Sequence, residues 1–140
     1  MRFWDASAIV PILIHEPGHD QLADLLRRDW AVAVWWTTPL ECASALSRAW
    51  RERRIDQAAS DAAVARLAHA RTRWVTVAPS EGVLELAIRL VRVHSLRAGD
   101  ALQLAAALQW VDGVPGGRSL VTGDQRLAAA AKAEGFTVLP

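Results

Sequence analysis

The chain has 140 residues, of which 52% are hydrophobic and 22% are charged, a balance typical of a folded domain and not of a disordered chain. This length predicts one domain, residues 1–140, with a core of its own. The net charge of +1 and the single cysteine point to no particular partner and exclude an internal disulfide. Because no apolar run is long enough for a signal peptide or a membrane span, we expect a cytoplasmic protein that makes no membrane contact.

Hydrophobic periodicity and turn residues predict strands and helices that alternate along the chain. Strands are expected at residues 2–5, 31–36, 74–77, 120–122 and 136–139, and helices at residues 6–15, 19–28, 38–53, 56–71, 81–94, 100–110 and 124–134. Thr38 is the predicted N-cap of the third helix, with Pro39 at its first helical position. The helix at 81–94 is supported by the helical spacing of Leu84, Ile88 and Val91. The alternation predicts an α/β fold, with a mainly parallel sheet covered on both faces.

Four acidic residues fall at strand ends or helix starts. Asp5 ends the first strand, and Asp124 follows the fourth strand by two residues. Asp100 opens the apolar helix at 100–110, and Glu41 lies in the first turn of the helix after the second strand. Ligands of open parallel sheets bind beyond the carboxyl ends of the strands. The sequence therefore predicts that these four carboxylates converge at one edge of the sheet.

A structural alternative exists for most of these acids, because Asp5, Asp100 and Asp124 suit the N-cap of a helix. Glu41 is harder to explain in that way, since it lies among apolar neighbours. Two carboxylates about 4 Å apart repel each other by roughly 4 kcal/mol at an effective dielectric constant near 20, so a cluster must take up protons or bind cations. Oxygen ligands suit Mg²⁺ or Mn²⁺ rather than zinc, and such ions promote phosphodiester hydrolysis.

Four segments together resemble the PIN domains, in particular the VapC toxins of type II (VapBC) toxin–antitoxin pairs. They are DASA at 5–8, TPLECASAL at 38–46, LRAGDALQLA at 96–105 and LVTGDQRL at 120–127. Each segment alone is a weak signal, but four in this order within 140 residues are specific. The resemblance covers essentially the whole chain and implies a three-layer α/β/α sandwich around a five-stranded parallel sheet.

The resemblance also implies a function, that of a metal-dependent endoribonuclease. The catalytic and metal-binding positions, for Mg²⁺ or Mn²⁺, would be Asp5, Glu41, Asp100 and Asp124. Ser7 and Thr122 match the supporting hydroxyl positions of the family. The implied reaction is in-line attack of water on RNA, which leaves a 5′-phosphate and a 3′-hydroxyl. The implied partners are an antitoxin protein, which often places an arginine in the site, and a second copy of the chain in a homodimer.

Two other functions compete with this one. The first is a non-catalytic PIN-like module that only binds RNA or a protein. The second is a receiver-like or phosphatase-like domain that is phosphorylated on Asp5. A haloacid-dehalogenase-type phosphatase would have a second aspartate where this chain has Ser7, and a receiver would have a lysine after a late strand, whereas Lys132 falls within the last predicted helix.

The segment His15–His19, HEPGH, matches the letters of the zinc-protease motif HExxH. That motif needs both histidines on one face of a continuous helix, and Pro17 and Gly18 would interrupt the helix. A zinc site is therefore not predicted here. His69 and His94 have no partner at a metal-binding spacing and are predicted to be surface or helix-end residues.

The remaining polar and aromatic signals favour structural roles. A run of arginines is expected to form a solvated helix face: Arg48, Arg51, Arg53 and Arg54. The seven tryptophans are expected to pack in the core or at interfaces, with Trp50 the best interface candidate. Cys42, beside Glu41, is predicted to be a buried thiol rather than a nucleophile, because no base stands near it in the sequence.

Overall fold

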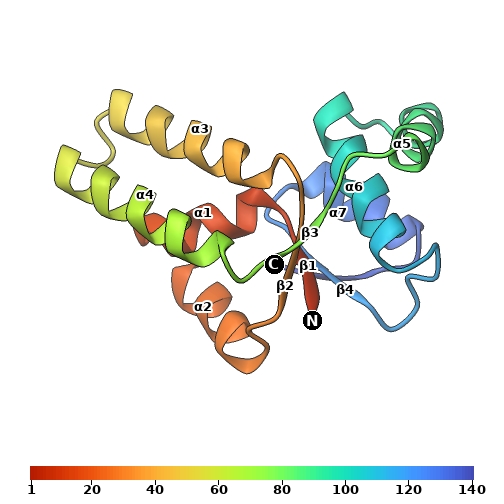
Figure 1. Ribbon diagram of the computed structural model, residues 1–140, viewed down its shortest axis with the longest axis horizontal. Coiled ribbons are helices and arrows are strands. Elements are labelled where there is room, and N and C mark those ends of the chain that lie inside the picture. Colours follow the sequence, from red (N-terminus) through yellow and green to blue (C-terminus); the bar gives the residue numbers. More distant parts are fainter.

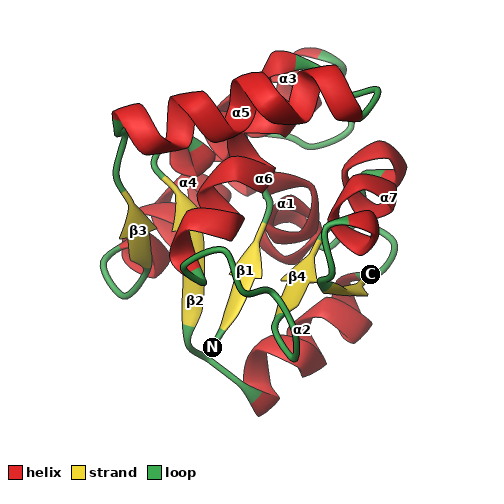
Figure 2. Ribbon diagram, turned by 90° about the vertical axis from the view of Figure 1, so that its right-hand side faces the viewer, coloured by secondary structure: helices red, strands yellow, loops and turns green.

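Five short strands form one parallel sheet in the computed structural model, which describes residues 1–140. The strands are β1 (Arg2–Trp4), β2 (Val32–Trp35), β3 (Val75–Val77), β4 (Ser119–Val121) and β5 (Thr137–Leu139). Their order is β3-β2-β1-β4-β5, and every neighbouring pair is parallel. Figure 2 shows β3, β2, β1 and β4 side by side in this order. The predicted five-stranded parallel sheet is confirmed.

Seven helices cover the sheet. They are α1 (Ala6–Ile14), α2 (His19–Arg28), α3 (Thr38–Arg51), α4 (Gln57–Arg71), α5 (Glu81–Val93), α6 (Ala98–Trp110) and α7 (Gln125–Ala133). Figure 1 shows α1 to α4 on one side of the sheet and α5 to α7 on the other. The predicted three-layer α/β/α sandwich is therefore confirmed. None of these helices combines the length and the apolar character that a membrane span would need.

The strands are apolar on both faces because both faces are covered. Successive residues of a strand point to opposite sides of a sheet, so Phe3 packs with α5, α6 and α7 while Trp4 packs with α1 to α4. Leu120 and Val121 of β4 divide between the two layers in the same way. The result is two hydrophobic clusters separated by the sheet, which explains why the strands read as continuous apolar runs.

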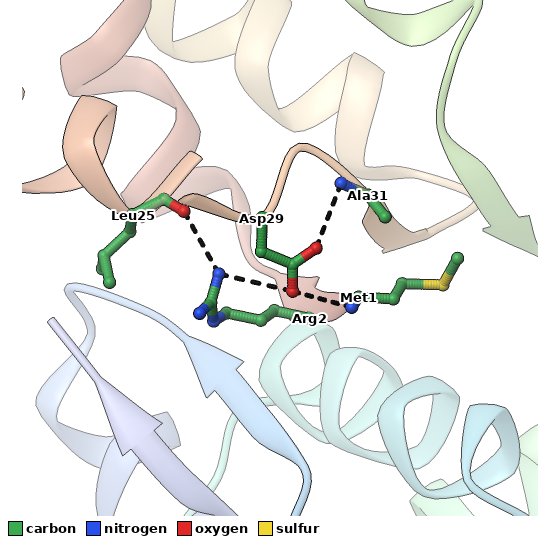
Figure 3. Close-up of polar contacts among 5 residues, drawn as sticks. All are labelled: Met1, Arg2, Leu25, Asp29 and Ala31. Carbon is green, nitrogen blue, oxygen red and sulfur yellow. Dashed lines mark hydrogen bonds and ion pairs between the residues drawn. The ribbon is translucent and has the colours of Figure 1, made fainter. Parts of the chain in front are cut away.

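The amino end of the sheet is fixed by Asp29, which follows α2 (Figure 3). Its carboxylate accepts a hydrogen bond from the amino group of Met1 at 2.7 Å and lies 3.4 Å from Nη1 of Arg2. The same Nη1 donates to the carbonyl oxygen of Leu25 at 3.1 Å, and the backbone N–H of Ala31 donates to Asp29 at 3.4 Å. The hydrogen bond from the amino group is the main reason why the pKa of Asp29 lies below its usual value. These contacts tie the start of β1 to the connection between α2 and β2.

Two helix starts differ from the prediction. Thr38 is the first residue of α3 rather than its N-cap, and the cap position is taken by Thr37, which makes no side-chain cap bond. The Thr38 side chain turns inward instead, where it is fully buried and accepts a hydrogen bond from Gln103 at 3.3 Å. The central helix α6 begins at Ala98, so Asp100 lies within its first turn and not at its N-cap.

Candidate active site

The carboxyl ends of β1, β2 and β4 meet at one edge of the sheet. β1 is the central strand, with β2 on one side and β4 on the other. The connection that leaves β1 leads to β2 and the connection that leaves β4 leads to β5, so the two run in opposite directions from this point. In open α/β sheets such a switch point forms a crevice in which ligands bind. Asp5 follows β1 directly, Glu41 lies in the first turn of α3 after β2, and Asp124 follows β4.

All four predicted acidic residues line one cavity of about 360 Å³: Asp5, Glu41, Asp100 and Asp124. Asp5 is buried, and the other three are half-buried. The structure thus brings the predicted carboxylates to one place, at the predicted edge of the sheet. They form an open cluster, since no three histidine, cysteine, aspartate or glutamate side chains lie close enough together to constitute a complete metal-binding group.

Three hydrogen bonds hold one oxygen of Asp5. Its Oδ2 accepts from the backbone N–H of Ser7 at 3.1 Å, from the Ser7 hydroxyl, and from the Thr122 hydroxyl at 3.1 Å. The two hydroxyl oxygens also lie 3.1 Å from each other. The predicted supporting residues therefore contact the predicted acid directly. They leave its other oxygen, Oδ1, without a donor from the protein.

Glu41 is held by two residues that the sequence analysis did not single out. The Thr37 hydroxyl donates to Oε1 at 2.6 Å, and Nε2 of Gln103 donates to Oε2 at 2.8 Å. Gln103 is buried on α6, and its own Oε1 has no partner. The sequence offered one signal for the role of Gln103. It is a polar residue inside the otherwise apolar run 101–108, one helical turn after Asp100.

Two of the acids are helix caps as well as cavity residues. Asp5 is the N-cap of α1, and Asp124 caps α7 by accepting a hydrogen bond from the backbone N–H of Leu127 at 2.8 Å. The capping and functional interpretations are thus compatible, because a cap uses one carboxylate oxygen and leaves the other. Local capping chemistry also fixes where these two carboxylates stand.

The concentration of negative charge in the cavity affects Asp100 and Cys42. The pKa of Asp100 lies above its usual value, mainly through burial and then through the negative charges of Asp124 and Asp5. Burial raises the pKa of Cys42 to about 12, and the charges of Asp5 and Glu41 add to the effect. Cys42 is fully buried, so the predicted burial of this thiol is confirmed. A bound cation would offset this concentration of negative charge.

The residues fit a hard divalent cation. Every acidic side chain in the cavity offers carboxylate oxygens, which are the ligands that Mg²⁺ and Mn²⁺ prefer. Oδ1 of Asp5 is free of protein donors. Each oxygen of Glu41 accepts one protein hydrogen bond and keeps a further lone pair.

The segment that matches HExxH is not one helix. α1 ends at Ile14 and α2 begins at His19, so His15 and His19 do not lie on one face of a continuous helix, although their ring centroids are 4.2 Å apart, with the rings tilted by 41°. Glu16 forms an ion pair with Arg54 instead of facing a metal. The expected interruption at Pro17–Gly18 is confirmed.

His94 has a partner that the sequence did not reveal. It is the C-terminal cap of α5, as expected of a helix-end residue. Its Nε2 lies 2.8 Å from Oε1 of Glu134, which also forms an ion pair with Arg89 at 2.7 Å. Glu134 lies 40 residues further along the chain, so a search for histidine partners at metal-binding spacings could not find this contact. His69 is exposed, as expected.

The arginine run is exposed, as predicted, but only Arg48 and Arg51 lie on α3, which ends at Arg51. Part of the run also borders the cavity. Arg48 and Arg54 line the cavity together with the four acids. Arg54 is engaged by Glu16 and Glu52, whereas Arg48 has no acidic partner. A positive side chain therefore stands free at the rim of a negative cavity.

The tryptophans divide between core and surface. Trp4 and Trp35 are buried, while Trp30, Trp36 and Trp50 are exposed at 74%, 59% and 46%. The expected core role is confirmed for the first two. An interface role for Trp50 stays a prediction.

The fold and the site together define the class of protein. It is a parallel α/β sandwich with an acidic cavity at the switch point of its sheet. The sequence pattern of the PIN domain matches residues 2–133. The chain belongs to the PIN domain family. No curated protein sequence gives a match.

Solved structures share this fold at low sequence identity. PAE2754 from Pyrobaculum aerophilum superposes with a TM-score of 0.66 at 23% identity, over 98% of this chain and 87% of that chain. A toxin-antitoxin complex from Klebsiella pneumoniae gives a TM-score of 0.67 at 16% identity, over 100% of this chain and 97% of that chain. The sarcin-ricin loop cleaving toxin VapC20 of Mycobacterium tuberculosis gives a TM-score of 0.68 at 19% identity, over 98% of this chain and 97% of that chain. At these identities the likeness is one of fold.

Proposed function

We propose that this protein is an endoribonuclease that hydrolyses phosphodiester bonds of RNA with Mg²⁺ or Mn²⁺. The observation that carries the proposal is that Asp5, Glu41, Asp100 and Asp124 line one cavity. They come from four separate parts of the chain, and a fold has no structural need to gather four like charges, which repel each other. Membership of the PIN domain family supports the same conclusion.

The cation, held by these carboxylates, would supply an activated water and stabilise the leaving oxygen of the phosphodiester. The chain's own residues orient the ligands: Ser7 and Thr122 hold Asp5, and Gln103 holds Glu41. Positioning of this kind raises the rate because the carboxylates need no rearrangement before reaction. Asp124, which is already engaged as a helix cap, would hold a second ion or orient the attacking water.

Arg48 is suited to bind the substrate. It is exposed at the rim of the cavity, where its guanidinium group would meet a phosphate of the RNA backbone. Contacts of this type position a strand without reading its sequence. RNA is a polyanion that suits this arrangement. The free arginine would bind one of its phosphates, and a metal ion held by the acidic cavity would neutralise the charge of the phosphate that reacts.

We further propose that the nuclease is the toxin of a toxin–antitoxin pair, with an antitoxin protein as its partner and a homodimer as its assembly in the cytoplasm. Two structures of the same fold support this role: one is described as a toxin-antitoxin complex and the other as a toxin that cleaves the sarcin-ricin loop. Expression of the chain alone should arrest growth, and co-expression of the neighbouring reading frame should relieve the arrest. If the expressed chain is an active nuclease and growth is unaffected, the toxin role is refuted and the nuclease function is not.

The nuclease function is tested with the purified full-length chain and a mixed RNA substrate. Cleavage is expected with Mg²⁺ or Mn²⁺, should stop on addition of a chelator, and should return when the metal is restored in excess. The products should carry 5′-phosphate and 3′-hydroxyl ends. Cleavage that persists unchanged in chelator would contradict the metal-dependent mechanism.

A non-catalytic PIN-like binding module is the second candidate, and the openness of the acidic cluster favours it. Such a module would bind RNA without cutting it, and divalent metal would not stabilise its fold. The phosphorylation alternative is less well supported, because the residue two places after Asp5 is Ser7, which hydrogen-bonds Asp5. Lys132 is exposed and is not among the residues that line the cavity.

A further inference from the structure

A second cavity, of about 320 Å³, adjoins the acidic one. Ser7, Pro11 and Asp124 line both cavities and form the boundary between them. The second cavity is also bordered by α2 and α7, through Gln21 and Gln125 in the first turns of these helices. Its volume is at the lower end of the roughly 300–1,000 Å³ that small-ligand sites occupy. The chain therefore has room for one small group beside the proposed cleavage site.

Part of the wall of this second cavity is apolar. Pro11, Pro17 and Leu22 present aliphatic carbon atoms, and Gly18 presents no side chain at all. Gly18 has a φ of 91°, a conformation that residues with a side chain rarely adopt, so the backbone itself keeps this part of the wall open. A flat ring can lie against such a surface, because close contact between carbon atoms is favourable.

The charge of the second cavity disfavours an anion. No arginine or lysine is among its twelve lining residues, and Asp124 is the one acidic side chain. A phosphate in this space would be repelled by Asp124, with no cationic side chain to offset the repulsion. A neutral group is therefore the favoured occupant.

Two side-chain amides at the border of the second cavity are free to bind a ligand. Gln21 and Gln125 are exposed and have no hydrogen-bond partner within the chain, whereas the amides of Gln57 and Gln103 donate to carboxylates. A side-chain amide carries an acceptor oxygen and two donor hydrogens. The edges of nucleobases present donors and acceptors side by side, so the free amides match the edge of a base.

We propose that the second cavity binds the base of a nucleotide next to the phosphate that is cut, and that Gln21 and Gln125 hydrogen-bond the edge of this base. The inference rests on the proposed nuclease function. When the reacting phosphate lies at the acidic cavity, the neighbouring base can turn across the boundary formed by Ser7 and Asp124. Single-stranded RNA is read in this manner, by bases that leave the stack and meet protein side chains. The two glutamines determine specificity and take no part in the chemical step.

The first test is cleavage of an RNA library of random sequence by the purified full-length chain with Mn²⁺, followed by sequencing of the cut ends. One base should be enriched by about tenfold at a position beside the cut, which is the discrimination expected of one good pair of hydrogen bonds. The enrichment should be lost in the double variant with Gln21→Ala and Gln125→Ala, while cleavage of the library persists. Alanine is the best helix former, so α2 and α7 should stay folded, and circular dichroism checks this.

Gln57→Ala is the matched control for the library experiment. Gln57 is the first residue of α4, as Gln125 is of α7, and it does not line the second cavity. This variant should keep the enrichment of the wild type.

Three results of the library experiment would overturn the inference. Cleavage by the wild type without any base preference would show that no base is read, although the nuclease function would stand. An enrichment that persists in the double variant would assign the reading of the base to other residues. If the chain cuts no RNA with either metal, the nuclease function fails and the base site fails with it.

The second test uses a short RNA with the preferred nucleotide beside a single cut site, and the same RNA with that base removed. The wild type should cut the abasic RNA about tenfold less efficiently in kcat/KM, because the two amides lose their partner. The double variant should cut both RNAs equally well. A site that is only misshapen by the substitutions would instead cut both RNAs slowly and keep the ratio of the wild type, which would contradict a direct contact with the base.

Discussion

Nε2 of Gln103 on α6 lies 2.8 Å from Oε2 of Glu41 on α3, so one hydrogen bond joins the two helical layers over the edge of the sheet. The same nitrogen contacts the buried hydroxyl of Thr38 at 3.3 Å. Because Thr37 holds the other oxygen of Glu41, the carboxylate is fixed from both sides. We infer that Gln103 positions Glu41 without contacting the substrate.

Replacing Gln103 with leucine should lower RNA cleavage by about 10- to 100-fold, the usual effect of removing a group that orients a metal ligand. The Mg²⁺ concentration for half-maximal activity should rise as well, which loss of packing alone would not cause. Gln109→Leu on the exposed face of the same helix is the control. Unchanged metal dependence in Gln103→Leu would show that this contact is only structural.

Asp5→Asn should abolish cleavage while the protein stays folded. Asparagine is as good a helix N-cap as aspartate, so the start of α1 should persist, whereas the site loses one negative charge and one ligand oxygen. Activity should fall by at least about 100-fold, with little change in the far-ultraviolet circular dichroism spectrum. Full activity in the purified variant would remove Asp5 from the catalytic set.

Divalent metal should stabilise the wild-type fold. A ligand that binds only the folded state adds about 2.7 kcal/mol at a concentration of 100 times its Kd, which should raise the Tm by several degrees in Mn²⁺ or Mg²⁺. The shift should be smaller in Asp5→Asn and in Asp100→Asn, because each lacks a ligand. An equal shift in all three proteins would place the metal elsewhere, and no shift in any would favour the non-catalytic binding module.

Arg48→Ala should weaken RNA binding more than catalysis. Loss of one phosphate contact is expected to raise KM about fivefold and to reduce the salt dependence of binding by about one unit of slope, with kcat nearly unchanged. Arg73→Ala is the control, since Arg73 is exposed just before β3 at the opposite end of the sheet. A fall in kcat with no change in KM would instead place Arg48 in the chemical step.

Glu134→Gln should destabilise the fold in a pH-dependent way. The hydrogen bonds from Arg89 are the main reason why the pKa of Glu134 lies below its usual value, and His94 contributes further. A depressed folded pKa adds stability above the unfolded pKa, and this stability is lost as the pH falls through the folded pKa. The loss in Glu134→Gln should be about 1 to 2 kcal/mol at neutral pH and should vanish in strongly acidic buffer.

Urea denaturation at several pH values measures this difference. The control is Asp61→Asn, whose carboxylate is exposed and accepts only from Gln57, and which should follow the wild type at every pH. A destabilisation of Glu134→Gln that stays constant into acid would show that packing, not charge, is responsible.

The sequence determined the elements and the place of two acids because both depend on local chemistry. Apolar runs fixed the strands, and the N-cap preference of aspartate placed Asp5 and Asp124 at the starts of α1 and α7. The spacing of Leu84, Ile88 and Val91 correctly predicted α5. The meeting of the four acidic residues in one cavity could be expected only because parallel strands end at a common edge.

The tertiary structure alone decided which groups meet. Gln103 and Glu41 are 62 residues apart, and His94 and Glu134 are 40 residues apart, so no local pattern pairs them. Helix α5 has two apolar stripes, one formed by Val83, Ala87 and Leu90 and one by Leu84, Ile88 and Val91. Periodicity could not tell that the first faces the core and the second is exposed, since both repeat with the helix. Such choices depend on how the layers pack, and packing joins residues whose separation along the chain carries no signal of their contact.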